Sequence, residues 1–481
     1  MKSSTKTTLI VLITGAFFAL LNNAFLNVAL AEIMHDLSIS ESTVQWMTTG
    51  YMLVNAILVP TTAFLMKKYS LRNLFLMSIG SFFIGSLLAG VAGSFGLLLT
   101  GRLIQGVGSA LLMPMGTFYL MTSFPKEKRG SMMGLFGIVI MFAPAIGPTL
   151  SGFLIEHYSW NVLFLIMVPI MGIVWLIGYF SLDKTKPSYS GKIDTLSVFF
   201  SAFAFSGILY GFSSAGNKGW GDTFVWLPIV LGCVFLALLI IRQFRLDDPM
   251  LDFGIYKSPQ YALASAITAT NIIAMYSAMI LIPLFLQNTQ GLGAMETGLI
   301  LLPGAILNGI MSPIAGRLFD KIGAKTLVLI GVMITIGTTI AFAQLDENTS
   351  STYIAVVYAL RMLSMSFVSM PIQTHGLNSL TTDQTPHGTA INSTLNQVAG
   401  AIGTSLLISV MVSRTKTHMA AVASQVTDQT SQQHLMLQSS INGVNDAFLA
   451  TLIVSGIAFI LALFLKKKSF KAESEPDASD K

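Results

Sequence analysis

Two arginines lie inside long apolar stretches of this sequence, where a charged side chain is costly. Arg102 occurs in LTGRLIQGVGSA and Arg361 in YALRMLSMSFVS. An arginine at such a position normally faces the interior of a helix bundle or a cavity. Arg102 therefore has two interpretations: a group that gates or responds to protonation of a neighbour, or a fixed hydrogen-bond clamp between helices. Gln105 and Gly106 follow in the same stretch, where Gln105 would hold the same helices together.

Two titratable groups within the apolar stretches have the chemistry to bind and release a proton. Glu32 lies near the end of the first stretch, and His375 lies in PIQTHGLNSL. Histidine titrates at about pH 6.5, whereas Glu32 is expected in the same outer half of the membrane as Arg102, whose opposite charge would interact with its carboxylate. The structural alternatives are a solvated helix end for Glu32 and a histidine hydrogen-bonded between helices for His375. We expect one of them to carry a proton, with Glu32 favoured.

The composition defines the class of protein in which these groups work. The 481 residues are 53% hydrophobic and only 10% charged, against about 25% charged residues in soluble domains. A soluble protein is therefore excluded. The single cysteine, Cys233, rules out an internal disulfide. The sequence contains no nucleotide-binding loop and no metal-ligand cluster, so we expect no enzyme, no cofactor, no metal ion and no nucleic-acid partner.

The apolar residues form fourteen runs of about 20 residues, the length that crosses a lipid bilayer. This pattern predicts an all-α membrane protein with fourteen transmembrane helices. The predicted spans are 8–31, 43–66, 74–93, 96–121, 131–155, 161–182, 195–215, 224–241, 262–286, 297–318, 326–344, 353–378, 389–411 and 447–465.

Positive charge predicts the orientation of these spans. If the N-terminus is cytoplasmic, the lysines and arginines between spans fall almost entirely on the cytoplasmic side, and the exceptions are Lys218, Arg414 and Lys416. We therefore expect a multi-pass protein of the bacterial cytoplasmic membrane with both termini inside. The polar segment 412–446 would form a flexible external cap.

The stretch 137–152, GIVIMFAPAIGPTLSG, combines small residues with two prolines. Gly147 lies between Ala143 and Ser151 in one row at a spacing of four, and Pro144, Pro148 and Gly152 form the next row. Such rows share one helix face and let another helix approach closely, while each proline bends the helix. The stretch predicts a hinge or seal between two halves, with an ordinary kinked packing helix as the alternative.

Related loops suggest that the chain is duplicated. AFLMKKYSLRNLFL follows the second span and GRLFDKIGAKTLVL follows the tenth, and the second copy contains Gly316, Asp320, Gly323 and Lys325. Duplicated halves are typical of secondary transporters. We predict a six-helix half at 1–182, an inserted helix pair with flanking loops at 183–261, a second six-helix half at 262–471 and a disordered tail at 472–481.

Several motifs resemble those of the major facilitator superfamily. GRLFDKIGAK is similar to its loop motif, RLIQGVGSA to its fourth-helix motif and APAIGPTLSG to the fifth-helix motif of its antiporters. LLNNAFLNVAL, VQWMTTGYML and TGLILLPGAI fit the fourteen-helix drug:proton antiporters at matching places, with the greatest similarity to lincomycin-resistance-type exporters. The resemblance implies drug efflux coupled to protons.

The chain departs from that family at two places. Asn22 and Asn23 stand where the first helix usually carries an acidic residue, and Lys67 replaces the usual aspartate of the first loop motif. No Asp or Glu lies near the centre of any predicted span. A proton carrier, if there is one, must therefore differ from the usual carboxylate.

We expect the substrate site between the two halves, near the middle of the membrane. The candidate lining residues are Asn22, Asn23, Phe25, Asn27, Met113, Met115, Asn271, Tyr276, Arg361, Asn392, Asn396 and Gln397. The expected partners are the lipid bilayer, amphiphilic small molecules and protons, and a monomer is expected. The hypothesis is multidrug efflux by alternating access. Its alternatives are an exporter of lipid or anionic metabolites, with Arg102 as the anion contact, and a membrane sensor or assembly factor.

Overall fold

The computed structural model describes residues 3–182, 194–422 and 429–466, and every regular element assigned within these ranges is a helix. The first group of helices comprises α1 (Ser3–Asp36), α2 (Glu41–Val44), α3 (Trp46–Leu58), η1 (Val59–Thr61), α4 (Thr62–Lys68), α5 (Leu71–Gly90), α6 (Phe95–Ser123), α7 (Lys126–His157), α8 (Val162–Leu165) and α9 (Met167–Ser181). The remaining helices are α10 (Thr195–Lys218), α11 (Thr223–Gln243), η2 (Phe253–Lys257), α12 (Pro259–Asn288), α13 (Ala294–Ile322), α14 (Ala324–Phe342), α15 (Ser351–Asn378), α16 (Thr385–Val422) and α17 (Gln429–Leu463).

These helices supply the predicted membrane spans. Within the described residues, 13 helical segments are long and apolar enough to cross a membrane. Helix α7, at 32 residues, covers the remaining predicted span, 131–155. The prediction of an all-α membrane protein with fourteen spanning helices is therefore confirmed. The predicted domain boundaries stay predictions, and the predicted tail, 472–481, lies outside the described residues.

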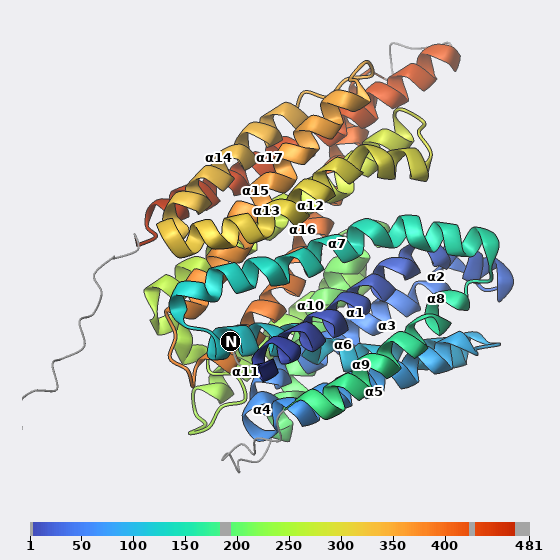
Figure 1. The fold of residues 1–481 in the computed structure, drawn as a ribbon. Helices are drawn as coiled ribbons and strands as arrows, with labels where there is room; N and C mark the ends of the chain where they lie inside the picture. The colour runs from blue at the N-terminus through green and yellow to red at the C-terminus, as the bar shows by residue number, and fades with distance from the viewer. Residues whose placement is uncertain (1–2, 183–193, 423–428, 467–481) are drawn as a thin grey trace, which may run out of the picture.

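The helices form two groups that lie side by side (Figure 1). Helices α12, α13, α14, α15 and α17 form the upper group, called the second group below, to which α16 belongs through its packing against α12 and α17. Helices α1, α3, α5, α6 and α9 form the lower, or first, group, to which α7 belongs through its packing against α1. Helix α7 runs along the boundary beneath α13. The end of the bundle at which α1 begins is called the N-terminal end below, and the opposite end is called the far end. Helix α7 begins and α13 ends at the N-terminal end.

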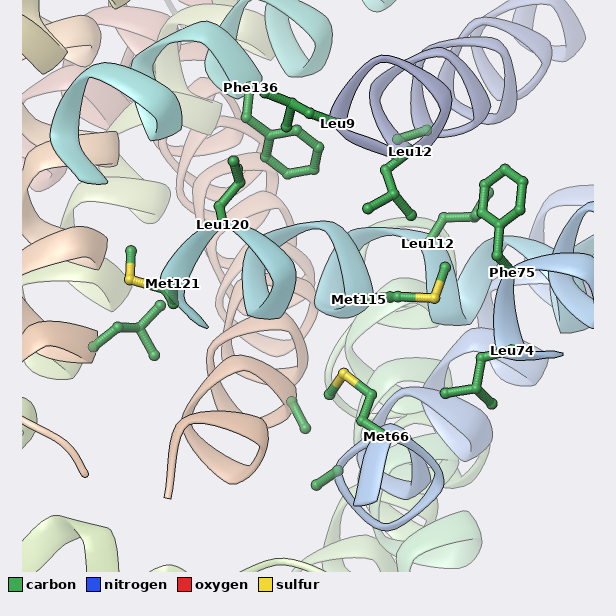
Figure 2. Close-up of a cluster of buried hydrophobic side chains, with 14 of the residues drawn as sticks. Leu9, Leu12, Met66, Leu74, Phe75, Leu112, Met115, Leu120, Met121 and Phe136 are labelled. Carbon is green, nitrogen blue, oxygen red and sulfur yellow. The ribbon is translucent and has the colours of Figure 1, made fainter. Parts of the chain in front are cut away.

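An apolar core joins the two groups at the N-terminal end. Figure 2 shows its part in the first group, where Leu12 of α1 points toward Phe75 of α5 and Met115 of α6, and Leu9 of α1 lies beside Phe136 of α7. The same cluster includes Met370 of α15 and further residues of α16 from the second group. Because burial of apolar side chains stabilises contact without directional bonds, this core holds the two groups together at that end.

The inserted helices α10 and α11 form a tight antiparallel pair. A Cβ atom on Gly207 would lie 2.6 Å from the carbonyl oxygen of Pro228, so only a glycine permits this approach. Arg242 donates hydrogen bonds of 2.6 and 2.8 Å to the Asp194 carboxylate. These bonds are the main reason that the pKa of Asp194 falls to about 2. The pair packs as a unit, and α10 contacts both α3 and α16.

The polar segment 412–446 is helical over most of its length, in contrast to the predicted flexible cap. Helix α16 continues to Val422 and α17 begins at Gln429, with 423–428 outside the described residues. Asp446 accepts hydrogen bonds from Arg414 and His418 at 2.6 and 2.8 Å and joins the two helices there. The hydropathy of the sequence indicates where a helix leaves the membrane, but the helix itself, which its backbone hydrogen bonds hold, can continue into water.

Candidate functional site

Arg102 binds a group of side-chain amides rather than a carboxylate. Its two terminal nitrogens donate to the oxygens of Asn22, Asn23 and Gln105 at 3.1, 3.1 and 2.8 Å. The guanidinium carbon lies 4.3 Å from the centre of the Tyr51 ring, and the side chain is fully buried. Gln105 in turn donates to Ser86 at 2.8 Å. The arrangement connects α1, α3, α5 and α6 through one charged group.

Asn22 and Asn23, the two asparagines that the sequence analysis singled out, are both partners of Arg102. Asn22 and Asn23 each offer a neutral carbonyl oxygen, which accepts from a guanidinium without titrating. The nitrogen Nε of Arg102 and the amide nitrogen of Asn22 have no hydrogen-bond partner among the described residues. Because Arg102 is buried and already engaged, the site offers little to an anionic substrate.

Arg361 has a corresponding but separate environment in the second group of helices. It donates to the Thr335 carbonyl oxygen at 2.8 Å, to the Thr339 hydroxyl at 2.6 Å and to the Ser277 hydroxyl at 3.0 Å. These partners lie on α14 and α12, and Arg361 itself is 1% exposed. The side chain therefore connects three helices of one group and does not face the pocket described below.

Neither of the two candidate proton carriers is in contact with Arg102. Glu32 is exposed near the far end of α1, and no hydrogen bond is assigned to it among the described residues. His375 is half-buried near the N-terminal end, where its Nε2 lies 3.0 Å from the Gln260 side-chain oxygen. That oxygen also accepts from the Lys466 backbone at 3.1 Å. The structure thus brings neither group to the arginine.

The closest approach between the two groups of helices is between α7 and α13. A Cβ atom on Gly134 would lie 2.5 Å from the Ser312 carbonyl oxygen and 3.2 Å from the Cα of Gly316. Ser312 donates to the Gly134 carbonyl oxygen at 2.9 Å. Asp320 accepts from the backbone nitrogens of Gly130 and Ser131, both at 2.8 Å. These residues are called the N-terminal seal below. The backbones of α7 and α13 come into contact there because the glycines have no side chains.

The small-residue stretch predicted as a seal has a different neighbour. A Cβ atom on Gly147 would collide with the methyl group of Ala24, which lies on α1 in the same group of helices. No atom lies within 4 Å of the position where a Cβ on Gly152 would stand. The side chains of Pro144 and Pro148 lie outside the described residues. On α7, the contacts of glycines with the second group run from Gly130 to Gly137, and the Phe142 ring meets Gly309 of α13, whereas Gly147 meets α1.

The remaining motif glycines and lysine lie at helix junctions. Gly323 joins α13 to α14 with φ of +81°, a backbone conformation that favours glycine. Lys325 donates to the Leu463 carbonyl oxygen at the end of α17. Gly106 of α6 lies against Val54, since a Cβ there would be 3.1 Å from the Val54 side chain.

A cavity of about 260 Å³ lies between α3, α10, α12 and α16. It therefore borders both groups of helices and the inserted pair. The lining residues carry no formal charge. They are Thr49, Met52, Leu53, Leu209, Tyr210, Phe212, Ser213, Tyr276, Gln397, Gly400, Ala401, Thr404, Ser405 and Ile408. This cavity is called the junction pocket below.

The junction pocket includes two of the residues predicted to bind substrate, Tyr276 and Gln397. Phe25 and Met115 are 1% exposed and lie in apolar clusters instead. Asn271 donates to Ser369 at 3.1 Å. Three other predicted positions also lie outside the pocket. Met113 packs on the apolar core, and Asn392 is buried. The side-chain oxygen of Asn396 is buried and has no hydrogen-bond partner among the described residues. The Asn27 side chain lies outside the described residues.

The walls supplied by α3 and α10 were not predicted, since no residue of either helix was among the candidates for the substrate site. Leu209, Tyr210 and Ser213 belong to an inserted helix without a counterpart in the second half. The sequence feature that could have indicated the α10 wall is the spacing of tyrosine and serine within an otherwise apolar helix. The buried His387, which accepts a hydrogen bond from the Asp252 backbone at 3.1 Å, was also not considered.

Comparison with known proteins places the chain among transporters. Residues 12–404 match the sequence model of the Major Facilitator Superfamily. The chain is 40% identical to the uncharacterized MFS-type transporter YhcA of Bacillus subtilis, covering 95% of this chain and 92% of that protein. It is 38% identical to the lincomycin resistance protein LmrB of Listeria monocytogenes, covering 94% and 95%.

A solved structure with the same arrangement of helices is the human organic anion transporter MFSD10 (TETRAN). The TM-score is 0.66, and the alignment covers 95% of this chain and 99% of that protein. The sequences are only 11% identical. The likeness therefore concerns the fold alone.

Proposed function

The chain belongs to the major facilitator superfamily of transporters, as its motifs predicted, and we propose that it exports amphiphilic compounds, antibiotics among them, by proton-driven alternating access. In this proposal the two groups of helices move as halves about the substrate. The N-terminal seal would close one side of the membrane while the junction pocket is accessible from the other. The reverse state would require the seal to open.

The observation that carries the proposal is the position of the junction pocket. The pocket lies where both halves meet, beyond an apolar core that holds the halves together at the N-terminal end. A ligand at such a place contacts both halves and can bind one conformation more tightly than the other, which is the requirement for shifting a two-state equilibrium. Resistance to lincomycin, recorded in the name of the similar LmrB, supports antibiotics as substrates.

The export function is tested in a Gram-positive host that lacks its own lincomycin exporter. Expression of the chain is expected to raise the inhibitory concentration of lincomycin and to lower accumulation of the radiolabelled drug in energised cells. Collapse of the proton gradient should restore accumulation to the level of cells carrying an empty vector. Equal sensitivity of expressing and control cells to a panel of amphiphilic antibiotics would contradict drug export.

The proposed orientation is tested by cysteine labelling in intact cells. Cys233 is first replaced by serine, and single cysteines are then introduced at Asn348 in the α14–α15 connection and at Lys321 near the end of α13. A membrane-impermeant maleimide is expected to label position 348 in intact cells and position 321 only after lysis, because the connection lies at the far end. The opposite labelling pattern would reverse the topology.

Proton coupling is tested with the two candidate carriers. Drug-induced proton movement is measured in everted vesicles for wild type, Glu32→Gln, His375→Gln and the double variant. We expect the double variant to lose coupling, and Glu32→Gln to reduce it more than His375→Gln because the Glu32 side chain is exposed while His375 is hydrogen-bonded to Gln260. Full coupling in the double variant would exclude both residues, and an uncoupled wild type would exclude antiport.

A further inference from the structure

The inserted helix α10 is more than a peripheral addition, because it contacts both halves beside the junction pocket. It packs against α3 of the first half and α16 of the second. Phe205 and Leu209 of α10 belong to one apolar cluster with Ala56, and Val398 of α16 packs against that cluster. Leu209 also lines the pocket. Helix α10 therefore takes part in the packing between the two halves and also forms one wall of the ligand pocket.

The chemistry of the pocket favours an uncharged ligand. None of the lining residues is charged, and a charged group inside a membrane protein is costly unless it is paired. Met52, Leu53 and Leu209 offer an apolar surface. On the α16 side, the Ser405 hydroxyl is buried, with 3% of the residue exposed, and has no hydrogen-bond partner among the described residues. A buried polar atom without a partner is costly, so a ligand hydroxyl that pairs with it is favoured.

The far end of the pocket is connected to the turn between α10 and α11. Trp220 in this turn donates a hydrogen bond of 2.7 Å to the Ser409 hydroxyl of α16. The Trp220 ring packs edge-to-face against Phe212, which lines the pocket, with 5.7 Å between ring centres. The turn thus attaches the inserted pair to the second half directly beside the ligand space.

We propose that α10 forms one wall of the substrate site and selects uncharged amphiphiles, which place a hydroxyl at Ser405 and an apolar body against α3 and α10. The inference rests on the proposed export function for its biological role. The binding site itself does not depend on transport. It can therefore be tested on purified protein, where the outcome is independent of whether the compound is exported.

The first experiment maps binding on the purified full chain in lipid nanodiscs. The probe is a ten-carbon alcohol bearing a diazirine, and its crosslinks are located by mass spectrometry. We expect labelling within 209–213 of α10 and 397–408 of α16. Unlabelled decanol should compete at least about tenfold better than the carboxylate or the trimethylammonium of the same chain length, which corresponds to about 1.4 kcal/mol. Crosslinks confined to α1 and α6, or equal competition by a charged analogue, would overturn the proposal.

Variants test whether α10 contributes to this binding. Ser213→Trp introduces a large ring at the pocket wall and is expected to reduce probe labelling at least about tenfold. The matched control, Phe203→Trp, changes an exposed residue of the same helix that does not line the pocket, and it should leave labelling unchanged. Ser405→Ala should weaken the alcohol probe several-fold without affecting a diazirine alkane. Unchanged labelling in folded Ser213→Trp and Ser405→Ala would contradict the assigned site.

The uncharged amphiphile in the pocket is either an exported compound or a membrane lipid, and competition experiments distinguish the two. Displacement of the probe by a compound that the cells export supports the substrate site. Displacement by an uncharged diacyl lipid but by none of the exported compounds would overturn it and assign the pocket to lipid. If wild-type cells export nothing while the pocket labels as expected, the proposed export function fails and the assignment of the binding site stands.

Discussion

Replacement of Gly134 by leucine is expected to abolish transport while leaving the protein in the membrane. Even a single Cβ atom at this position would lie 2.5 Å from the Ser312 carbonyl oxygen and 3.1 Å from the Cα of Pro313. Both neighbours are backbone atoms of α13, so they cannot turn away as the end of a flexible side chain would. The leucine must therefore hold α7 and α13 apart at the N-terminal seal.

The expected size of this effect follows from the cost of overpacking. Extra methylenes in a packed contact typically cost about 1–3 kcal/mol. Because only the closed state of the seal carries the cost, the equilibrium between the two transport states would shift by a factor of about 5 to 150. The variant should accumulate in the state with an open N-terminal end, and maleimide access to a cysteine at Ser131 should increase.

The same helix offers a matched control for the seal. Gly152→Leu adds the same side chain to α7, but no atom lies within 4 Å of the Cβ position there. This variant should be expressed and should export drug at a rate close to wild type. If Gly134→Leu transports normally, or if both variants lose activity equally, the contact of α7 with α13 is not the moving seal.

The second large effect is expected for Arg102→Lys, which retains the charge but removes the planar fork. The two terminal nitrogens of Arg102 reach oxygens on both α1 and α6, and the guanidinium stacks on Tyr51 of α3. A lysine ammonium is a point charge and cannot reproduce that geometry. A hydrogen bond that involves a charged group contributes about 1.5–3 kcal/mol to stability, so losing one of them should lower the free energy of unfolding by about that amount and slow export.

The control for Arg102→Lys is Arg317→Lys, which makes the same exchange at an exposed position of α13. Export rates are measured at equal amounts of membrane-inserted protein, together with thermal unfolding of the purified variants. We expect Arg102→Lys to lower both the rate and the midpoint of unfolding, while Arg317→Lys changes neither. Wild-type rates in Arg102→Lys would show that a positive charge alone is sufficient at this position.

The sequence by itself determined the class of protein, the fourteen spans and the family. These properties depend on apolar run length, on the placement of lysine and arginine, and on short motifs, all of which are local along the chain. Arg102 and Gln105 were also identified in this way, since an arginine within an apolar helix is conspicuous wherever the helix packs. The structure added their partners, which include Asn22 and Asn23 as neutral acceptors of hydrogen bonds from Arg102.

Only the tertiary structure decided which side of each helix meets which neighbour. Phe25 and Met115 were candidates for the cavity but lie in apolar clusters, whereas Tyr210 and Ser213 of the inserted helix line the junction pocket. Gly147 packs within one half, and the seal between halves forms at Gly134. In a membrane, an apolar residue suits lipid, a packed helix or a cavity about equally well, so hydropathy does not distinguish them. Which of these surroundings an apolar residue has depends on contacts between residues distant in the sequence, and a local pattern does not predict such contacts.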